Sequence, residues 1–576
     1  MNFEQLFGAG GREVSGHSAP DSSRRAAVAL AFLSRNLPRS LISEQLAKSL
    51  CTETGASVVL VRMKPCDVRS PFGGGFNDDA TVVDWASTDL VLQGQFRTCS
   101  LFRTEAGFHI LTLSVRTGPT SPEWIASLLG PLKRHFRYVL IEAPADDAVA
   151  GLVFEFLRNS DQAYLFLEAA SEDMRNLDRL MQDIVSSGPI NVDRFKTVLC
   201  LPEGAKAAAF ELIVRNATTR VERFLHDTPR FSAQNDSAAL SGLTRRFKTE
   251  LRRLTREISG RLVGLALSSG AAKGFAHIGV IQILEENGIE VDAVAGASIG
   301  AYIGALWTYG LNGTELEALA REMESRWGFW GLLDPVFPPR QGFLRGLALR
   351  KRLMRSIGDA RFADLARPLR VVASNLSTLD RTVFATGEVA PVVHASMAVP
   401  GICVPVMIDG EAYIDGGIVD PVPVDLLRDM GAALVIAVNT IPAPDRLRHG
   451  GRRQNGHPAG EAPATPSGRL RKLFRKVLPI DKQLNYFAQG NLFEILVRSV
   501  HGAQARLADA SCRLADLVLH PDVPDDRWLD CRNPGRFITL GREVAERNLA
   551  QIKALVERDK INHETEFTPR ALAAVA

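Results

Sequence analysis

The segment VAGASIG, residues 294–300, places a serine at the spacing G-x-S-x-G, with Gly296 and Gly300 on either side of Ser298. In this pattern the serine stands on a sharp turn from a strand to a helix and attacks a carbonyl carbon. The alternative is a small residue in a tightly packed helix start. A serine hydroxyl is a weak nucleophile at neutral pH, so catalysis also needs a base and hydrogen-bond donors for the oxyanion.

The candidate donors lie just upstream, in LSSGAAKG at residues 267–274. This stretch follows an apolar segment and opens a predicted helix, so its backbone N–H groups point outward at the positive end of the helix dipole. Small residues let the backbone come close to a substrate. An ordinary turn or a nucleotide phosphate cradle is the alternative. Nucleotide binding is disfavoured here because neither G-x-G-x-x-G nor G-K-[ST] is present.

The candidate base is Asp415 in YIDGG, residues 413–417. It ends a short apolar strand, and Gly416 and Gly417 turn the chain sharply away. Active sites of α/β sheets lie at the ends of strands, which favours a catalytic carboxylate at this position. The alternative is a plain Asp-Gly turn.

A triad that includes a histidine is the rival arrangement. His520 in LVLHPD stands at a predicted strand end and is the candidate third member. His277 and His394 lie among apolar and small residues, which favours structural roles for both. From the residues alone, a dyad of Ser298 and Asp415 and a triad with His520 both remain open.

Taken together, the small-residue turn, G-x-S-x-G and D-G-G resemble the patatin-like phospholipase family. The resemblance covers roughly residues 260–560 and is strongest to the bacterial branch related to neuropathy target esterase. It includes GFAHIGVIQILEENGIEVDAVAGASIGA and ASMAVPGICVPV at 395–406. The resemblance implies that Ser298 is the nucleophile and Asp415 its base, without histidine, metal or cofactor. It also places the oxyanion hole at the backbone N–H groups of Gly270 and Ala271.

The turn departs from the family pattern, which is G-G-G-x-[RK]-G. Here Lys273 holds the basic position and Gly274 the last glycine, but Ser269 and Ala271 replace two glycines. Backbone donors survive any non-proline replacement, whereas a Cβ at Ala271 demands an allowed φ and takes up space. Reduced activity or a restricted substrate size is the expected consequence.

Two α/β domains are predicted, because strand-like runs alternate with helical patterns. Residues 1–24 are expected to be disordered, and 25–235 to form the first domain. Residues 236–260 form a basic linker helix, 261–560 the patatin-like domain and 561–576 a tail. Within the second domain, the Pro/Gly/Ala-rich stretch 443–468 is predicted to be a flexible loop.

The first domain weakly resembles the ParA/MinD-type nucleotide-binding domain, in LAKSLCTETGASVVLV and FRYVLIEAP. The position of the phosphate loop, after the strand predicted at Ala26–Phe32, reads LSRNLPRS. It has neither glycine nor a Gly-Lys pair, so NTP binding is not expected. The domain is interpreted as a degenerate P-loop-like scaffold or partner-binding module.

Membrane contact is expected from two basic segments. Along 240–258, apolar residues recur at three- and four-residue steps while arginine and lysine fill much of the remainder. This pattern fits either a connecting helix with a solvated face or a helix attracted to anionic lipid. The second segment is RLRKLFRK at 469–476. An aromatic and apolar group is interpreted either as an acyl channel or lid, or as part of a buried core; its members are Trp327, Phe329, Trp330, Val336 and Phe337.

Composition limits the remaining options. The 576 residues carry a formal net charge of +3, so nucleic acid is not expected as a partner. The seven cysteines are scattered, without a C-x-x-C pair, and favour reduced thiols in a cytoplasmic protein. Neither a secretory signal nor a run of about 18–20 apolar residues is visible, so any membrane contact is expected to be peripheral, at the inner face.

The sequence thus predicts a serine esterase that cleaves phospholipids or lysophospholipids. The alternative is a catalytically weakened patatin-like protein that acts as a membrane-associated regulatory or interaction module. The head group, the acyl chain preference and the oligomeric state are not specified by these patterns.

Overall fold

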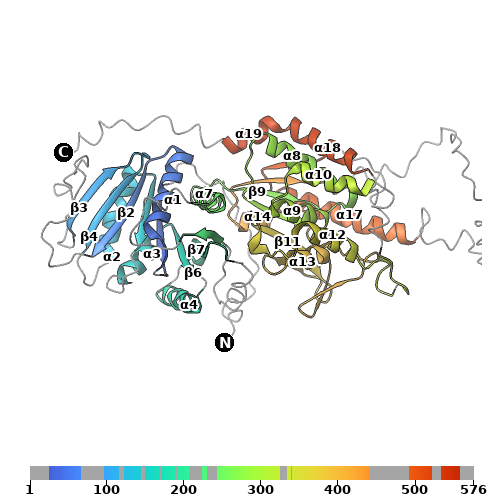
Figure 1. The fold of residues 1–576 in the computed structure, drawn as a ribbon, viewed down its shortest axis with the longest axis horizontal. Coiled ribbons are helices and arrows are strands. Elements are labelled where there is room, and N and C mark those ends of the chain that lie inside the picture. The colour runs from blue at the N-terminus through green and yellow to red at the C-terminus, as the bar shows by residue number, and fades with distance from the viewer. Residues whose placement is uncertain are drawn as a thin grey trace, which may run out of the picture. The chain divides into compact units, whose positions relative to one another are not determined.

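The computed structural model describes thirteen stretches of the chain: residues 25–34, 36–65, 96–115, 122–143, 150–168, 170–188, 191–205, 223–229, 243–324, 334–338, 340–441, 492–521 and 533–557. The chain divides into two compact units, the first reaching Leu262 and the second running from Val263 to Leu555. Each unit contains its own mixed α/β sheet (Figure 1). The predicted α/β fold class is confirmed for both. The regions predicted as a disordered N-terminus, a loop at 443–468 and a C-terminal tail lie outside the described residues.

The first unit is built on one sheet with the strand order β3-β4-β2-β5-β1-β6-β7-β8. All neighbouring pairs are parallel except β3 with β4. The strands are β1 Ala26–Phe32, β2 Val58–Pro65, β3 Phe96–Arg103, β4 His109–Val115, β5 Tyr138–Ala143, β6 Gln162–Glu168, β7 Phe195–Pro202 and β8 Arg223–Thr228.

Both faces of this sheet are buried, which is why its central strands are continuous apolar runs. Alternate residues of a strand point to opposite faces, so Val28 and Leu30 pack in one core and Ala27 in the other. Helix α1 (Arg39–Thr54) contributes to the first core, and helices α2 (Pro122–His135) and α3 (Ala150–Asn159) contribute to the second. Helix α4 is Ser171–Ser186.

Helix α7 (Arg245–Ile258) lies in the segment predicted to be a basic linker helix, and its apolar side chains pack on the first sheet. Its apolar stripe lies in the same core as α1; the stripe consists of Phe247, Leu251, Leu254 and Ile258. The partners of that stripe, helix α1 and strands of the first sheet, are distant from it in sequence. The apolar face of α7 is therefore committed to the protein core and is not available to a bilayer.

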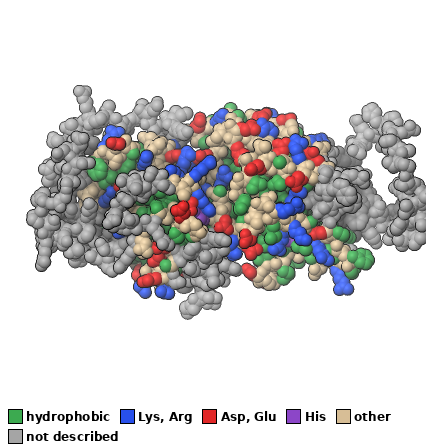
Figure 2. Space-filling view, viewed as in Figure 1, with side chains coloured by type: hydrophobic (Ala, Val, Ile, Leu, Met, Phe, Trp, Pro, Cys, Tyr) green, Lys and Arg blue, Asp and Glu red, His purple; other side chains and the backbone are tan. Residues whose placement is uncertain are grey.

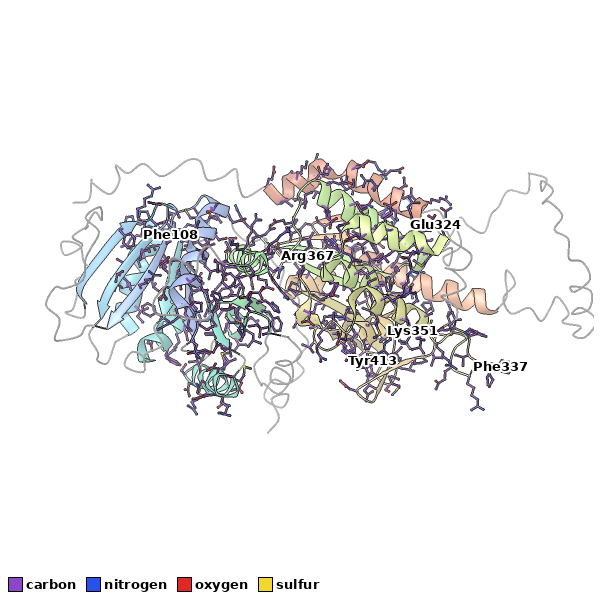
Figure 3. The ribbon with its side chains drawn as sticks, in the orientation of Figure 1. Phe108, Glu324, Phe337, Lys351, Arg367 and Tyr413 are labelled. Atoms are coloured by element: carbon purple, nitrogen blue, oxygen red, sulfur yellow. The ribbon has the colours of Figure 1, made fainter. Side chains whose placement is uncertain are left out.

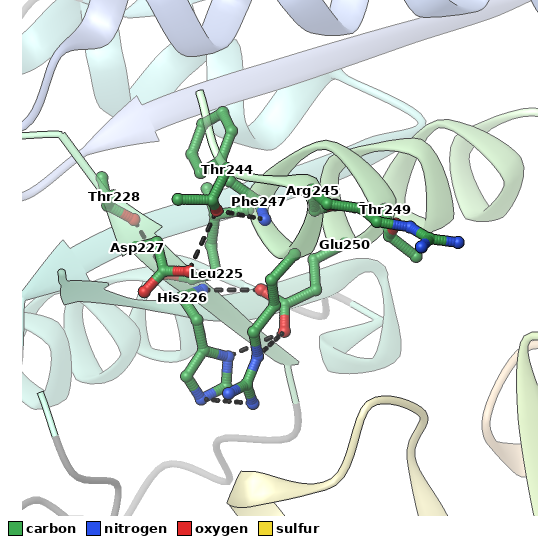
Figure 4. A network of polar contacts seen from close by, with 10 residues as sticks. Leu225, His226, Asp227, Thr228, Thr244, Arg245, Phe247, Thr249 and Glu250 are labelled. Atoms are coloured by element: carbon green, nitrogen blue, oxygen red, sulfur yellow. Dashed lines mark hydrogen bonds and ion pairs between the residues drawn. The ribbon is translucent and has the colours of Figure 1, made fainter. Parts of the chain in front are cut away.

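Buried charges hold α7 on strands β7 and β8, and Figure 4 shows the contacts with β8 around His226 and Glu250. The carboxylate of Glu250 accepts the backbone N–H of His226 at 2.6 Å and lies 2.7 Å from its Nδ1. Glu257, about two turns further along α7, pairs with Arg223 at 2.6 Å and with Lys196 at 2.8 Å. The two cations hold the pKa of Glu257 at about 2 despite its burial. Through these pairs, Glu250 and Glu257, the two acidic residues of a strongly basic helix, attach α7 to the strands of the first unit.

The second unit has a mixed sheet with the order β13-β14-β11-β10-β9-β15-β16, and β12 pairs with β11. Strands β11, β10, β9, β15 and β16 are parallel to one another, whereas β12 and β14 run antiparallel to β11. The strands are β9 Val263–Leu267, β10 Ala293–Ala297, β11 Leu369–Asn375, β12 Arg381–Phe384, β13 Val406–Ile408, β14 Glu411–Asp415, β15 Leu434–Val438 and β16 Leu517–Leu519.

Helices surround this sheet (Figure 1). They are α8 Ala276–Glu286, α9 Ile299–Tyr309, α10 Gly313–Arg321, α12 Leu347–Ile357, α13 Val389–Ser396, α14 Val424–Asp429, α17 Leu492–Cys512, α18 Pro534–Arg547 and α19 Leu549–Glu557. Helices α18 and α19 are separate because α18 ends at a C-cap on Asn548.

Candidate active site

Ser298 lies at the turn between β10 and α9, with φ +54° and ψ −122°. A positive φ is uncommon for a residue with a side chain and marks a strained turn. The two glycines of the motif are required by packing. A Cβ on Gly300 would lie 2.2 Å from the carbonyl oxygen of Leu267, and one on Gly296 would lie 2.7 Å from the backbone of Gly300. The two glycines of G-x-S-x-G are therefore explained by the lack of space for a side chain on either side of Ser298.

Strand register brings Asp415 to Ser298. In the ladder, Ala297 pairs with Val372 and the next residue of β11, Ala373, pairs with Asp415. The hydroxyl of Ser298 donates a 2.6 Å hydrogen bond to Oδ2 of Asp415, across 117 residues of sequence. The backbone N–H of Gly417 donates to Oδ1 at 2.8 Å. Both oxygens of the carboxylate therefore have a donor, and one of these donors is the candidate nucleophile.

Burial controls the protonation of Asp415. The residue is 3% exposed, and desolvation raises its pKa to about 6, although the bonds from Ser298 and Gly417 act in the opposite direction. The carboxylate is thus charged at neutral pH but more basic than an ordinary aspartate. Gly416 permits this burial, because a Cβ there would lie 2.0 Å from the carbonyl oxygen of Val372.

The predicted donor turn lies beside the elbow. Gly270 has φ +156°, and a Cβ on it would lie 2.3 Å from the Thr440 hydroxyl, so only glycine fits. A short 3₁₀ helix, Ala271–Phe275, follows. Gly274 packs against the side chain of Ile299, the residue after Ser298, where a Cβ would lie 2.2 Å from Cγ2. Within the described part of the chain, the N–H groups of Gly270 and Ala271 donate none of the backbone hydrogen bonds.

The two departures from the family pattern have structural consequences. Ala271 has φ +50°, in the left-handed region that disfavours a Cβ by about 1 kcal/mol. Ser269 is 3% exposed, and its hydroxyl has no hydrogen-bond partner among the described residues. Lys273 is also buried. The turn is therefore held in place by its surroundings against a local cost.

Ser396 is a site residue that the sequence analysis missed. Its hydroxyl accepts the backbone N–H of Ser298 at 2.8 Å and donates to the carbonyl oxygen of Val372 at 2.6 Å. Ser268 and Thr440 were missed too; their hydroxyls lie 3.1 Å apart beneath the donor turn. No sequence pattern around a single serine or threonine predicts such a contact.

The histidines take backbone partners. Nε2 of His277 lies 2.8 Å from the carbonyl oxygen of Ser268, and burial lowers its pKa to about 4. Nε2 of His394 lies 3.0 Å from the carbonyl oxygen of Arg345. His520 lies with Nδ1 2.6 Å from the carbonyl oxygen of Asn439. Since Ser298 and Gly417 are the donors found at Asp415 among the described residues, the geometry favours the dyad over the triad with His520.

A small pocket lies near the elbow, and its lining includes neither Ser298 nor Asp415. Tyr302, whose backbone N–H donates to the carbonyl oxygen of Ser298, is part of its wall, and so is Met397, the neighbour of Ser396. The other lining residues come from α12, the turn before it, α13 and the segment after it; they are Gly346, Leu349, Arg350, Leu353, Val393, His394 and Cys403.

Only part of the aromatic and apolar group lies among the described residues. Phe337 is 95% exposed, and Val336 is half-buried. Phe337 therefore belongs neither to a core nor to the lining of this pocket. Trp327, Phe329, Trp330 and the basic stretch 469–476 lie outside the described residues. In the part of the chain that is described, no helix has the length and apolar character that crossing a bilayer requires.

Comparisons with known proteins agree with this geometry. Residues 265–428 match the model of the family described as patatin-like phospholipase. The chain is 32% identical over 218 residues to lysophospholipase nte1 of Aspergillus fumigatus, covering 38% of this chain and 14% of that protein. It is 34% identical over 195 residues to neuropathy target esterase sws of Drosophila melanogaster, covering 33% and 14%. The matched segment thus spans about one seventh of the length of these relatives.

Among solved structures, the chain is similar to a ParA family ATPase from Chlorobium tepidum TLS. The identity is 11%, the TM-score is 0.29, and the match covers 40% of this chain and 98% of that one.

Proposed function

We propose that this chain is a serine hydrolase that cleaves the carboxylic ester bonds of phospholipids or lysophospholipids, because residues 265–428 match the model of the patatin-like phospholipase family. The observation that carries the proposal is the 2.6 Å hydrogen bond from Ser298 Oγ to Asp415 Oδ2, at a strained elbow. The names of the relatives, lysophospholipase and neuropathy target esterase, favour a lipid ester as the substrate.

In the proposed first step, Oγ of Ser298 attacks the ester carbonyl carbon while Asp415 takes its proton. The carbonyl oxygen becomes an oxyanion, which accepts hydrogen bonds from the N–H groups of Gly270 and Ala271. The tetrahedral intermediate collapses, the C–O bond to the alcohol breaks, and Asp415 returns the proton to the leaving alkoxide. The fatty acyl group is then held as an ester on Ser298.

In the second step, water replaces the alcohol. Asp415 accepts a proton from the water as its oxygen attacks the acyl carbon, and the same donors hold the oxyanion. Collapse releases the fatty acid and returns the proton to Ser298. A base whose pKa lies near 6 suits both steps, because it is charged at neutral pH and still basic enough to take a proton in the transition state.

The test is labelling with a fluorophosphonate probe of the wild type, Ser298→Ala, Asp415→Asn and His520→Ala. We expect no labelling of Ser298→Ala, at least about a hundred-fold slower labelling of Asp415→Asn, and wild-type rates for His520→Ala. Release of fatty acid from lysophosphatidylcholine and phosphatidylcholine then identifies the ester. Labelling that survives Ser298→Ala, or that His520→Ala abolishes, would contradict the dyad.

The second candidate function is a weakened patatin-like module with a regulatory or binding role. It is favoured by the positive φ of Ala271 and the unpartnered hydroxyl of Ser269, both in the proposed oxyanion turn. A folded wild type that is not labelled, together with labelling restored by Ala271→Gly, would support it. Comparable labelling of both proteins would dismiss it.

A further inference from the structure

A hairpin-like segment next to the pocket exposes an aromatic side chain. Val336 donates its backbone N–H to the carbonyl oxygen of Phe343, and a bridge joins Pro335 to Leu344. Between these contacts, Phe337 is 95% exposed, and Phe343 itself is 42% exposed. Figure 3 shows Phe337 at the far end of this segment, pointing away from the ribbon. A group of exposed apolar side chains, larger than a single one, is a mark of an interaction surface.

The segment is anchored at its base. Phe343 and Leu344 donate their backbone N–H groups to the carbonyl oxygen of Ile402 at 2.8 and 2.9 Å. The carboxylate of Asp334 accepts the N–H groups of Gly346 and Ala348 at 2.9 and 3.1 Å, which caps the start of α12. The segment that carries Phe337 is therefore attached to the rest of the second unit by these hydrogen bonds.

Helix α12 adds cations and further apolar side chains to the same surface. Leu347, Lys351, Met354 and Arg355 recur at helical spacing, so they share one face, and all four are exposed. Arg340 and Arg345 are exposed on the segment that leads to the helix. Within the described residues, Arg340, Arg345, Lys351 and Arg355 take part in no salt bridge; the exposed acid Asp359 follows the helix end. Figure 2 shows Lys and Arg side chains beside hydrophobic ones on this edge.

Helix α12 contributes residues both to this surface and to the small pocket near the elbow. Leu349 and Leu353 of α12 line that pocket, while Lys351 and Arg355 of the same helix face solvent. Tyr302, one helical turn after Ser298, also lines this pocket.

We propose that Phe337, Phe343 and the exposed face of α12 form a docking surface for an anionic lipid membrane. The protruding aromatic and apolar side chains enter the headgroup region, and the unpaired cations bind anionic headgroups. Charge complementarity favours a membrane over a neutral apolar partner. The inference rests on the proposed function only in the role that it gives to membrane binding, which is to bring lipid esters to Ser298. Membrane binding itself is measured without catalysis.

The test is co-sedimentation of the full chain, carrying Ser298→Ala so that lipid is not consumed, with two kinds of vesicle. One is phosphatidylcholine alone, and the other is phosphatidylcholine mixed with phosphatidylglycerol. A cation at an anionic surface strengthens binding about five-fold, so Lys351→Glu with Arg355→Glu is expected to weaken binding to the anionic vesicles at least about ten-fold. Phe337→Ser is expected to weaken binding to the anionic vesicles by about ten-fold.

Matched controls lie elsewhere on the second unit. Arg547→Glu with Lys553→Glu changes the net charge equally, on α18 and α19, which lie at a different edge of the unit from α12 (Figure 1). Leu514→Ser removes an apolar side chain that is 47% exposed, next to β16. Both controls should stay within about two-fold of the parent, since neither site contributes to the proposed contact.

Several outcomes would overturn the docking surface. They are unchanged binding of the charge-reversed or Phe337→Ser chain, equal losses in the controls, and no preference for anionic vesicles. Loss of binding to an acidic soluble protein without any change on vesicles would instead indicate a protein partner. Wild-type hydrolysis of a short-chain soluble ester, measured separately, reports on the proposed function, so the two proposals fail in distinguishable ways.

Discussion

The backbone N–H of Ser298 donates a 2.8 Å hydrogen bond to the hydroxyl of Ser396, which in turn donates one of 2.6 Å to the carbonyl oxygen of Val372. Ser396 is fully buried at the end of α13, and Val372 lies on β11. This chain of bonds ties the strained elbow to the strand that also pairs with the strand of Asp415. The positions of the proposed nucleophile, Ser298, and of its proposed base, Asp415, are thus fixed by the same strand.

Ser396→Ala should therefore weaken both the fold and catalysis. It leaves the N–H of Ser298 without its acceptor, at a cost of about 1–3 kcal/mol in the free energy of unfolding. Because the elbow then loses its restraint, kcat should fall more than about five-fold with little change in KM. Denaturant unfolding and ester kinetics measure the two effects, with Ser356→Ala on α12 as the control. An unchanged kcat in Ser396→Ala would show that the bond does not position Ser298.

The pH dependence of ester hydrolysis should follow Asp415. Its pKa is raised to about 6 by burial, and only the ionised carboxylate can accept the proton of Ser298. We expect kcat/KM for a soluble ester to be flat above about pH 7 and to fall about ten-fold per pH unit well below pH 6. An acid limb near pH 4, the ordinary range of an aspartate, would contradict the assignment of Asp415 as the buried base.

Restoring glycine in the donor turn should stabilise the protein. Ala271 has φ +50°, which glycine adopts without cost, so Ala271→Gly should raise the free energy of unfolding by about 0.5–1 kcal/mol. The matched variant is Ala272→Gly, at the next position, which is also buried. Ala272 does not have a positive φ, so glycine there should lower the free energy of unfolding by a similar amount. Thermal or denaturant unfolding compares the two. Equal effects of both variants would show that Ala271 is not strained.

Glu257 should hold α7 on the first sheet in a pH-dependent way. Lys196 and Arg223 depress its pKa to about 2 in the folded protein, so it contributes stability that is present above its ordinary pKa and lost as pH falls toward 2. Glu257→Gln should cost about 3 kcal/mol at neutral pH and progressively less in acid. Hydrogen exchange of amides in α7 and β8 measures this loss, with the exposed Glu203→Gln as control. Wild-type protection in Glu257→Gln would rule out the anchoring role.

The elements of the site could be predicted because their signals are local. Ser298 is flanked by glycines that the elbow demands, and Asp415 ends an apolar strand before two glycines. Burial on both faces makes the central strands apolar, which is why β1 has the predicted bounds, Ala26–Phe32.

Other features are set by partners that are distant in sequence. The period of α7 predicts an apolar stripe but does not reveal what covers it, and the covering strands lie in the first sheet. The exposure of Phe337 likewise depends on where α12 and the segment at Ile402 hold its hairpin.

The sequence by itself determined the kinds of groups at the site and the turns that carry them, since glycine spacing and apolar runs follow from backbone sterics and burial. Only the tertiary structure decided that Ser298 and Asp415 meet at 2.6 Å, that Ser396 holds the elbow, and that Ala271 adopts a positive φ. Each of these depends on strand register or on contacts between residues far apart in the chain, and such contacts leave no periodic trace in the sequence.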